Sequence, residues 1–267
     1  MQYRKLSRQL KSREKMKRIT IYIIALLATL SVSATPTSAE RWEAGNKHYI
    51  EGNFDKAVKE YHAILDGGEY SMKLYYNLAN AYFKLGNIGK SILYYNKALR
   101  IAPSEEDVRH NLAIAEAQTK DRIAVVPEFF LNRWLRTMRN SMSCTAWSAL
   151  SLVALGVLLA FALLFLLASR IRWRKLGFYG ALCCATLFVT LTSFAVSSRD
   201  DMLERDEAIV MGSAISVKSS PDASATDLFV LHEGTKVKVL TEVDEWCEVV
   251  IADGKKGWTL KSNVEEI

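Results

Sequence analysis

Residues 85–99 read LGNIGKSILYYNKAL, and the same pattern stands 34 residues earlier as EGNFDKAVKEYHAIL in residues 51–65. At this offset Gly52 aligns with Gly86. A glycine there supplies the turn between two antiparallel helices, where the backbone needs a left-handed or unhindered conformation. The period therefore predicts a repeated unit of helix, turn and helix, whose neighbours stack to bury a continuous core.

The repeated unit resembles the tetratricopeptide repeat (TPR) family over roughly residues 41–120, and the second repeat carries the family pattern most fully. Ala57 and Ser91 are small where the two helices of each repeat would cross. Pro103 ends the second repeat, and the residues after it predict a capping helix. The first repeat departs from the pattern, because Glu69 stands where a closing proline is usual. We therefore expect an all-α TPR solenoid of two repeats and a cap.

Asparagines recur on the first helix of each predicted repeat and on the capping helix. The TPR resemblance implies that these first helices line a concave side, which binds extended peptides or protein surfaces. Amides there can hydrogen-bond the main chain of a partner in any sequence context. The candidate protein-binding residues are Asn46, Asn77, Asn80 and Asn111. The alternative is that these amides are solvated or hydrogen-bond within the repeats.

One TPR subtype holds a C-terminal carboxylate with two asparagines and three basic residues. Asn46 and Asn77 match the two asparagines of that subtype. Its basic positions are occupied here by Trp42, Asp107 and Asn111. Without positive charges there, we do not expect carboxylate capture.

Two uncharged apolar runs follow the repeats, 23 residues long in 146–168 and 21 residues long in 176–196. At a rise of about 1.5 Å per residue, each can cross about 30 Å of hydrocarbon. The second run is rich in small residues, which allow close helix packing. No other segment of the chain could enclose two such helices in a soluble core, so the runs predict a two-helix transmembrane hairpin.

The short connection between the runs, residues 169–175, contains the sequence RIRWRK. Its positive residues are Arg170, Arg172, Arg174 and Lys175. Basic short loops stay on the cytoplasmic side, so both flanking soluble parts should lie outside the cytoplasm. The N-terminus agrees, because eight basic residues in 1–18 precede an apolar stretch, as in a secretory signal peptide. Ala39 is its expected last residue, with an uncleaved anchor as the alternative.

Three arginines precede the first apolar run on its predicted outer side, Arg133, Arg136 and Arg139. They alternate with aromatic residues, Phe129, Phe130 and Trp134. This mixture of long cationic and aromatic side chains predicts an interfacial helix that lies on lipid head groups.

The C-terminal part alternates apolar and charged residues with period two, as in GTKVKVL of residues 234–240. Residues 245–260 predict a hairpin, because Asp253 and Gly254 can form its tight turn. Short, closely spaced strands predict a small all-β barrel, and the pattern resembles bacterial SH3 (SH3b) domains. That resemblance implies binding of cell-wall peptides or proteins. Trp246 and Trp258 could form an exposed aromatic platform or pack in the core.

The sequence carries no recognisable motif for catalysis, metal binding or nucleic-acid binding. Outside residues 1–18 the chain has 27 basic and 28 acidic residues, and no clustered basic face away from the membrane-proximal segments. Its four histidines and four cysteines lack metal-ligand or redox spacing. We therefore expect no enzyme activity, no cofactor, no metal and no nucleic-acid partner.

The order of these segments, with VVPEFFLNRWLR at residues 125–136, resembles the BatE-like TPR proteins of the Bacteroides aerotolerance (Bat) operon. The resemblance implies membership of a membrane-associated Bat assembly, whose other members carry von Willebrand factor A domains. It also implies a role in envelope or oxidative stress tolerance.

The sequence thus predicts a multi-pass protein of the bacterial inner membrane with two periplasmic modules. The predicted segments are a signal peptide in 1–39, TPR repeats in 41–120, an interfacial linker in 121–145, spans in 146–168 and 176–196 around a cytoplasmic turn in 169–175, a linker in 197–205 and an SH3b domain in 206–267. We expect a non-enzymatic scaffold. The alternative is a cell-wall-binding accessory protein that regulates a peptidoglycan hydrolase through its SH3b domain.

Overall fold

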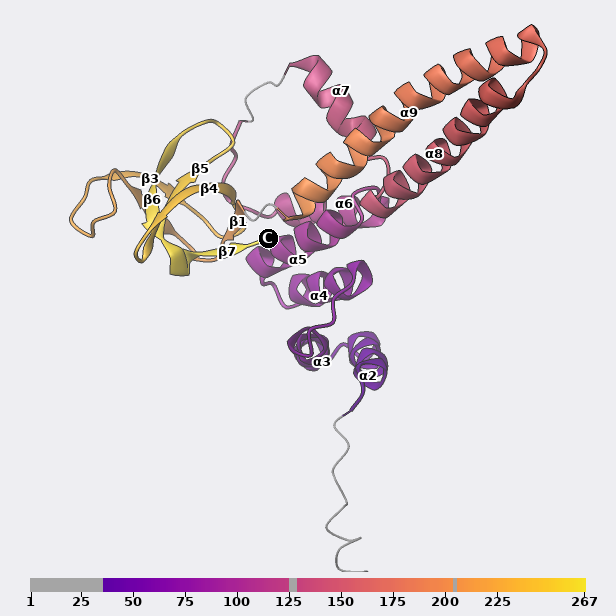
Figure 1. The fold of residues 1–267 in the computed structure, drawn as a ribbon. Helices are drawn as coiled ribbons and strands as arrows, with labels where there is room; N and C mark the ends of the chain where they lie inside the picture. The colour runs from indigo at the N-terminus through magenta and orange to yellow at the C-terminus, as the bar shows by residue number, and fades with distance from the viewer. Residues whose placement is uncertain (1–35, 125–128, 204–205) are drawn as a thin grey trace, which may run out of the picture. The chain divides into compact units, whose positions relative to one another are not determined.

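The computed structural model describes residues 36–124, 129–203 and 206–267. Most of the predicted signal peptide, residues 1–35, lies outside the described residues, and so do residues 125–128 of the interfacial linker. The first described helix, α2 (Ser38–Ile50), already includes Ala39, the expected last residue of the signal peptide. Figure 1 shows the helices and strands that follow it along the chain.

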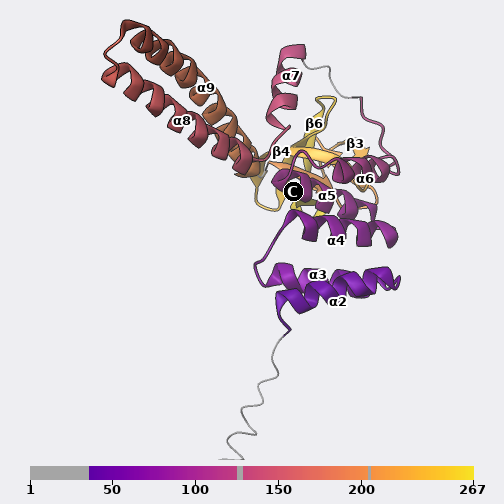
Figure 2. The same cartoon turned by 90° about the vertical axis from the view of Figure 1, so that its right-hand side faces the viewer.

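Five helices form the repeats and their cap, and Figure 2 shows them stacked in chain order. After α2 come α3 (Phe54–Asp66), α4 (Met72–Lys84), α5 (Ile88–Ile101) and α6 (Glu106–Glu116). Gly52 and Gly86 adopt φ values of 79° and 77°, which confirms the predicted left-handed turns. Asn87 then begins α5, because its side chain accepts a hydrogen bond from the Lys90 N–H.

The core of the repeats is built from small residues at helix crossings and large aromatic ones between helices. Ala57 and Ser91 are fully buried, as the repeat pattern predicted. Tyr61 and Tyr95, which the repeat offset aligns, are also almost completely buried. A Cβ atom on Gly45 would lie 2.6 Å from the ring of Tyr61, so α2 can approach α3 only with glycine there.

Two long helices, α8 (Cys144–Leu167) and α9 (Ile171–Leu203), pack along each other as a hairpin. Both are long and apolar enough to cross a membrane, and they leave large apolar side chains exposed, such as Leu152 and Leu166. The hairpin therefore allows a membrane anchor. Its helices touch at Gly177, where a Cβ atom would lie 2.5 Å from the backbone nitrogen of Phe165.

Helix α9 extends beyond the predicted second span at both ends. It begins at Ile171, so most of the predicted turn in 169–175 is helical, and it continues through the predicted linker to Leu203. The Arg170 carbonyl accepts hydrogen bonds from the N–H groups of Trp173 and Arg174, which starts the helix within the charged sequence. Long basic side chains can direct their charges away from an apolar surface, so the charges need no separate loop.

The C-terminal part is a seven-stranded sheet. Its strands are β1 (Glu207–Val210), β2 (Ile215–Lys218), β3 (Asp227–Leu231), β4 (Lys236–Val243), β5 (Trp246–Val250), β6 (Lys256–Leu260) and β7 (Val264–Glu266), with the short helix η1 (Lys261–Asn263) before β7. The strand order is β3-β2-β6-β5-β4-β1-β7. The predicted hairpin is confirmed as β5 and β6, whose turn holds Gly254 at a φ of 88°.

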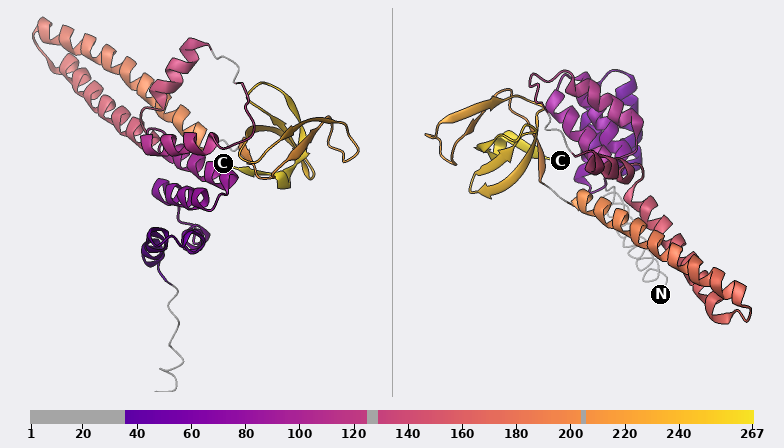
Figure 3. Two further views of the ribbon diagram at one scale, coloured as in Figure 1. Left: turned by 180° about the vertical axis from the view of Figure 1, so that it is seen from behind. Right: turned by 90° about the horizontal axis from the view of Figure 1, so that it is seen from above.

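The expectation of a closed barrel was wrong, because the sheet is open between β3 and β7 (Figure 3). Among the described residues, β3 pairs only with β2, and β7 pairs only with β1. Both sides of β1 are already occupied, by β4 and by β7, and β7 is three residues long. No long strand is therefore left to complete the ring.

Candidate binding surfaces

The asparagines on the first helices form a hydrogen-bonded unit with a buried tyrosine. Asn46 Oδ1 accepts hydrogen bonds from the Tyr61 hydroxyl at 2.8 Å and from Asn77 Nδ2 at 2.9 Å. The unit joins α2, α3 and α4, so it connects the two helices of the first repeat to the start of the second. Burial raises the pKa of Tyr61 to about 12, and its hydroxyl therefore remains a donor at neutral pH.

The same unit recurs 34 residues later. Asn80 Oδ1 accepts from the Tyr95 hydroxyl at 2.5 Å and from Asn111 Nδ2 at 3.2 Å. Asn111 Nδ2 also donates to the hydroxyl of Tyr76 at 2.8 Å. The two units therefore form a ladder of asparagine pairs along the first helices, each pair supported from behind by a buried tyrosine.

The four predicted asparagines do lie close together. One amide atom of each side chain forms hydrogen bonds within the repeats, as the alternative interpretation expected. Asn46 and Asn80 use their Oδ1 atoms, and Asn77 and Asn111 use their Nδ2 atoms. All four side chains are half-buried. Within the described residues, the other amide atom of each side chain bonds to no protein group. Each pair thus presents one donor and one acceptor, the combination that an extended peptide backbone requires.

The positions expected to be basic in a carboxylate clamp hold no positive charge. The ring of Trp42 lies 5.8 Å from that of Tyr61 and packs against the core of the repeats. Asp107 lies in the first turn of α6, where an acidic side chain favours the helix, and is exposed. The structure therefore gives no support for capture of a carboxylate group.

Both tryptophans of the sheet lie on its outer face. In β5 and β6 the side chains of Cys247, Val249 and Thr259 are buried, whereas the alternating Trp246 and Trp258 are only half-buried. Neither tryptophan belongs to the buried core cluster of the sheet. This burial pattern favours the aromatic platform over core packing.

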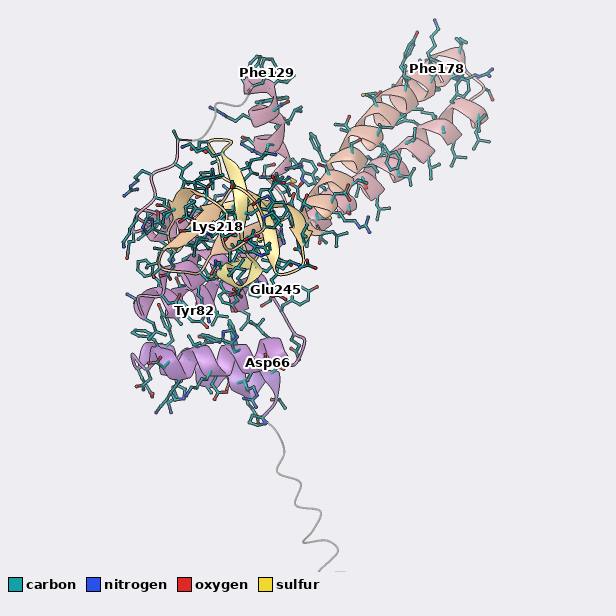
Figure 4. All side chains as sticks on the ribbon, turned by 90° about the vertical axis from the view of Figure 1, so that its left-hand side faces the viewer. Asp66, Tyr82, Phe129, Phe178, Lys218 and Glu245 are labelled. Atoms are coloured by element: carbon teal, nitrogen blue, oxygen red, sulfur yellow. The ribbon has the colours of Figure 1, made fainter. Side chains whose placement is uncertain are left out.

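Different neighbours surround the two tryptophans on this outer face. Trp246 stands opposite Val243 and Leu260, which are 42% and 38% exposed. Trp258 stands opposite Glu248 and Lys218, the latter labelled in Figure 4. We call these residues, Trp246, Trp258, Val243, Leu260, Glu248 and Lys218, the tryptophan face. It combines an apolar end with a charged end, as a surface for a mixed polar and apolar ligand would.

A junction that the sequence did not reveal joins the sheet to α5. Ile209 and Ile267 of the sheet belong to the same buried core as the repeats. Glu233 Oε1 accepts a hydrogen bond from the Gly89 N–H at 2.8 Å and so satisfies a donor in the first turn of α5. Gly234, at a φ of 86°, comes so close that a Cβ atom would lie 2.9 Å from Ile92 Cδ1.

The segment after α6 strengthens this junction through Asp121. Its Oδ2 accepts hydrogen bonds from the His232 N–H at 2.7 Å and the Thr235 hydroxyl at 2.6 Å, and its Oδ1 lies 2.7 Å from His232 Nδ1. Burial raises the pKa of Asp121, but the hydrogen bonds from Thr235 and His232 outweigh burial and hold that pKa below its ordinary value. One carboxylate thus ties the turn before β4 to the helical part.

Replacing Asp121 with asparagine should destabilise the protein at pH 7 by about 2 kcal/mol, because an amide cannot accept all of these hydrogen bonds. Since the folded pKa is lowered, the carboxylate stabilises the fold above its ordinary pKa of 3.8 and loses this contribution as the pH falls through the folded value. The difference in free energy of unfolding between the unaltered protein and Asp121→Asn should therefore disappear at low pH. Denaturant unfolding of the full chain in mild detergent measures it.

Asp253→Asn is a suitable control, because Asp253 lies in the β5–β6 turn and pairs with Lys255 of the same turn. It should change the unfolding midpoint far less than Asp121→Asn. A pH-independent difference for Asp121→Asn would contradict the assigned carboxylate.

The four basic residues between the apolar runs lie at the start of the hairpin turn and of α9. Arg170 precedes α9, whereas Arg172, Arg174 and Lys175 lie within its first two turns. The guanidinium carbon of Arg174 lies 5.5 Å from the ring centroid of Phe165 on α8. All four side chains are exposed.

The described residues contain no group of three or more His, Cys, Asp or Glu side chains that could hold a metal ion. His62 Nε2 lies 2.8 Å from the Tyr82 hydroxyl, and His232 Nδ1 lies 2.7 Å from Asp121 Oδ1. Burial is the main cause that lowers the pKa of His62. Cys247 is buried, and burial raises the pKa of its thiol to about 11, which makes it a poor nucleophile.

Two parts of this architecture match known families. Residues 73–105 match the family model of the tetratricopeptide repeat, and residues 213–265 match that of the bacterial SH3 domain. The matches confirm the TPR and SH3b resemblances. No curated protein matches the chain. Both families are modules for protein interaction, or for cell-wall interaction in the case of SH3b. The matched regions include Asn77 and Asn80 of the ladder and the whole tryptophan face.

Proposed function

We propose that this protein is a non-enzymatic scaffold anchored in the bacterial inner membrane by α8 and α9. In this proposal, both soluble modules face the periplasm. The asparagine ladder binds an extended segment of a partner protein, and the tryptophan face binds a second partner or the cell wall. Two modules held on one anchor raise the effective concentration of one partner near the other.

One observation carries the proposal: the sheet packs against α5, the second helix of its repeat, and leaves the first helices open. The junction residues Gly89 and Ile92 lie on α5, whereas the asparagine ladder lies on α2, α4 and α6. The SH3b domain therefore joins the repeats without covering the ladder. The periplasmic orientation is supported by the basic residues of the hairpin turn and the basic N-terminus.

We further propose that the partners include proteins with von Willebrand factor A domains, as in a Bat-type assembly for stress tolerance. This part rests on the resemblance in segment order alone. It is testable because the ladder offers a residue that can be changed without disturbing the core. Ile114 stands 34 residues after Asn80 and three after Asn111, so it shares their helix face, and it is 43% exposed.

Ile114→Glu should lower partner recovery about tenfold, because it places a charge on the exposed helix face that carries the ladder. Spheroplasts would be treated with a cross-linker that cannot cross the membrane, and the full-length protein would then be purified in detergent. Recovery of von Willebrand A proteins by the unaltered chain would support both the partner class and the outer orientation.

Tyr70→Glu is the matched control, because Tyr70 is 69% exposed and lies between α3 and α4, away from the ladder. It should leave recovery unchanged. Equal losses for the two variants, or no cross-linking of the unaltered chain from outside, would contradict the proposal.

A further inference from the structure

The first helix of each repeat carries its ladder asparagine between two aromatic rings. The order is Trp42, Asn46 and Tyr49 on α2, and Tyr76, Asn80 and Phe83 on α4. The spacing of four and then three residues places each set on one helix face. All four rings are half-buried. The Tyr76 ring lies beside the ladder, because its hydroxyl accepts a hydrogen bond from Asn111. The ladder therefore runs between two rows of flat apolar surface.

The amide atoms that the ladder does not use internally remain accessible. They are Asn46 Nδ2, Asn77 Oδ1, Asn80 Nδ2 and Asn111 Oδ1. None of them is among the fully buried side-chain atoms that lack a partner in the described part of the chain. Each outward donor and acceptor can therefore be reached by a ligand, and a ligand that displaces water there must replace its hydrogen bonds.

Neither the sheet nor α7 covers the ladder in the part of the chain that the structure describes. The sheet meets α5 instead, through Glu233 and Gly89. Helix α7 (Phe130–Arg139) forms within the predicted interfacial linker, and none of its residues is buried. Its last residue, Arg139, pairs with Asp201 of α9 at 2.5 Å. On α6, Ile114 stays 43% exposed. The helix faces that carry the ladder are therefore open to a ligand.

The outward atoms repeat with the spacing of the first helices. Asn46 and Asn80 are equivalent positions of the two repeats, and the hydrogen bonds of the ladder make α2, α4 and α6 neighbours. Packed helices lie about 8 to 10 Å apart. Along a β-strand, groups that point the same way recur after two residues, at about 6.7 Å. One turn of polyproline II spans three residues and about 9.3 Å, and its backbone N–H and C=O groups make no internal hydrogen bonds. Of these two extended conformations, polyproline II matches the ladder.

We propose that the asparagine ladder binds a proline-rich segment in the polyproline II conformation, with one turn of the segment at each asparagine pair. Each pair donates to one carbonyl of its turn and accepts from one N–H, so one position in every three is not proline. The prolines pack on the two rows of rings. This inference rests on the proposed function, because it specifies the kind of segment that the ladder binds.

Fluorescence anisotropy of labelled 12-residue peptides, titrated with the purified full chain in mild detergent, tests the proposal. A peptide of four Ala-Pro-Pro units offers an N–H at every third position. A peptide of six Ala-Pro units keeps the conformation, but two positions three apart are never both alanine, so it satisfies only one pair. A peptide of six Gly-Ser units keeps every N–H but is a flexible coil. The Ala-Pro-Pro peptide should bind at least about fivefold more tightly than each of the others.

Asn80→Asp tests the ladder itself. A carboxylate can still accept from the Tyr95 hydroxyl and from Asn111, but its second oxygen replaces the outward donor. Binding of the Ala-Pro-Pro peptide should weaken about tenfold. Asn87→Asp is the matched control, because it makes the same change in the turn before α5 and keeps the acceptor for the Lys90 N–H. It should change binding less than twofold, and both variants should keep the helical circular dichroism of the unaltered chain.

Equal binding of the Ala-Pro-Pro and Ala-Pro peptides would overturn the period of three residues. Binding of the Gly-Ser peptide as tight as that of the Ala-Pro-Pro peptide, or binding of no peptide, would overturn the polyproline II conformation. Equal weakening by the two variants would show a general charge effect and overturn the ladder as the site. The scaffold proposal is judged separately by partner recovery with Ile114→Glu, which does not depend on the conformation of the bound segment. The two failures can therefore be told apart.

Discussion

Gly177→Ala is expected to separate α8 from α9 and to destabilise the hairpin by about 3 kcal/mol. The added Cβ atom would lie 2.5 Å from the Phe165 nitrogen, 2.8 Å from its Cα and 2.9 Å from the Phe161 carbonyl oxygen. These are backbone atoms, so no side-chain rotation can relieve the clash. Helices in lipid associate largely through close packing, and a separation of this kind removes that packing along several turns.

The hairpin contains its own control in Gly156 of α8. A Cβ atom there meets nothing within 4 Å, so Gly156→Ala should leave stability unchanged or raise it by up to about 1 kcal/mol through helix propensity. Thermal unfolding of the full chain in mild detergent, followed by circular dichroism, compares the two. Similar losses for both glycines would mean that the helices do not meet at Gly177.

Tyr95→Ala is expected to destabilise the repeats by about 4 kcal/mol, which is enough to unfold many domains of this size. Its side chain is 1% exposed and fills the space between α4, α5 and α6. Truncation leaves a cavity and also removes the hydroxyl that donates to Asn80. The measurement is denaturant unfolding of the full chain, together with partner recovery, because the ladder should lose its support.

Two further variants divide this effect into its parts. Tyr95→Phe removes only the hydroxyl and should cost about 1 kcal/mol. Tyr70→Ala, at a tyrosine that is 69% exposed, should change stability by less than about 0.5 kcal/mol. A loss for Tyr95→Ala no larger than that for Tyr70→Ala would contradict the burial of Tyr95.

The helical repeats were predictable because the residues that form their turns and core occur twice in the sequence, 34 residues apart. Gly52 and Gly86 both mark left-handed turns, and the asparagine and tyrosine pairs share the same offset of 34 residues. The grouping of Asn46, Tyr61 and Asn77 could also have been anticipated, since each member has its counterpart in the next repeat. Sequence spacing does not show which amide atoms face inward, because that depends on side-chain rotamers.

The junction between the sheet and α5 could not be predicted, for a different reason. Glu233 and Gly89 are 144 residues apart, and neither belongs to a repeated or periodic pattern. Asp121 lies in a segment of ordinary loop composition, so only the folded structure shows that it accepts bonds from His232 and Thr235. The open sheet was missed because strand patterns give the number of strands but not the pairing of the edges.

The same separation imposes an order of events during synthesis. The helical repeats leave the ribosome first. The Gly89 N–H and the surface around Ile92 gain their contacts only when Glu233 and Gly234 have been synthesised, and these two residues follow both apolar helices of the hairpin. Until those last residues have been made, the apolar surface of α5 around Ile92 stays uncovered. A nascent chain stalled within the hairpin would therefore display this surface to chaperones and proteases, and completion of the sheet would hide it.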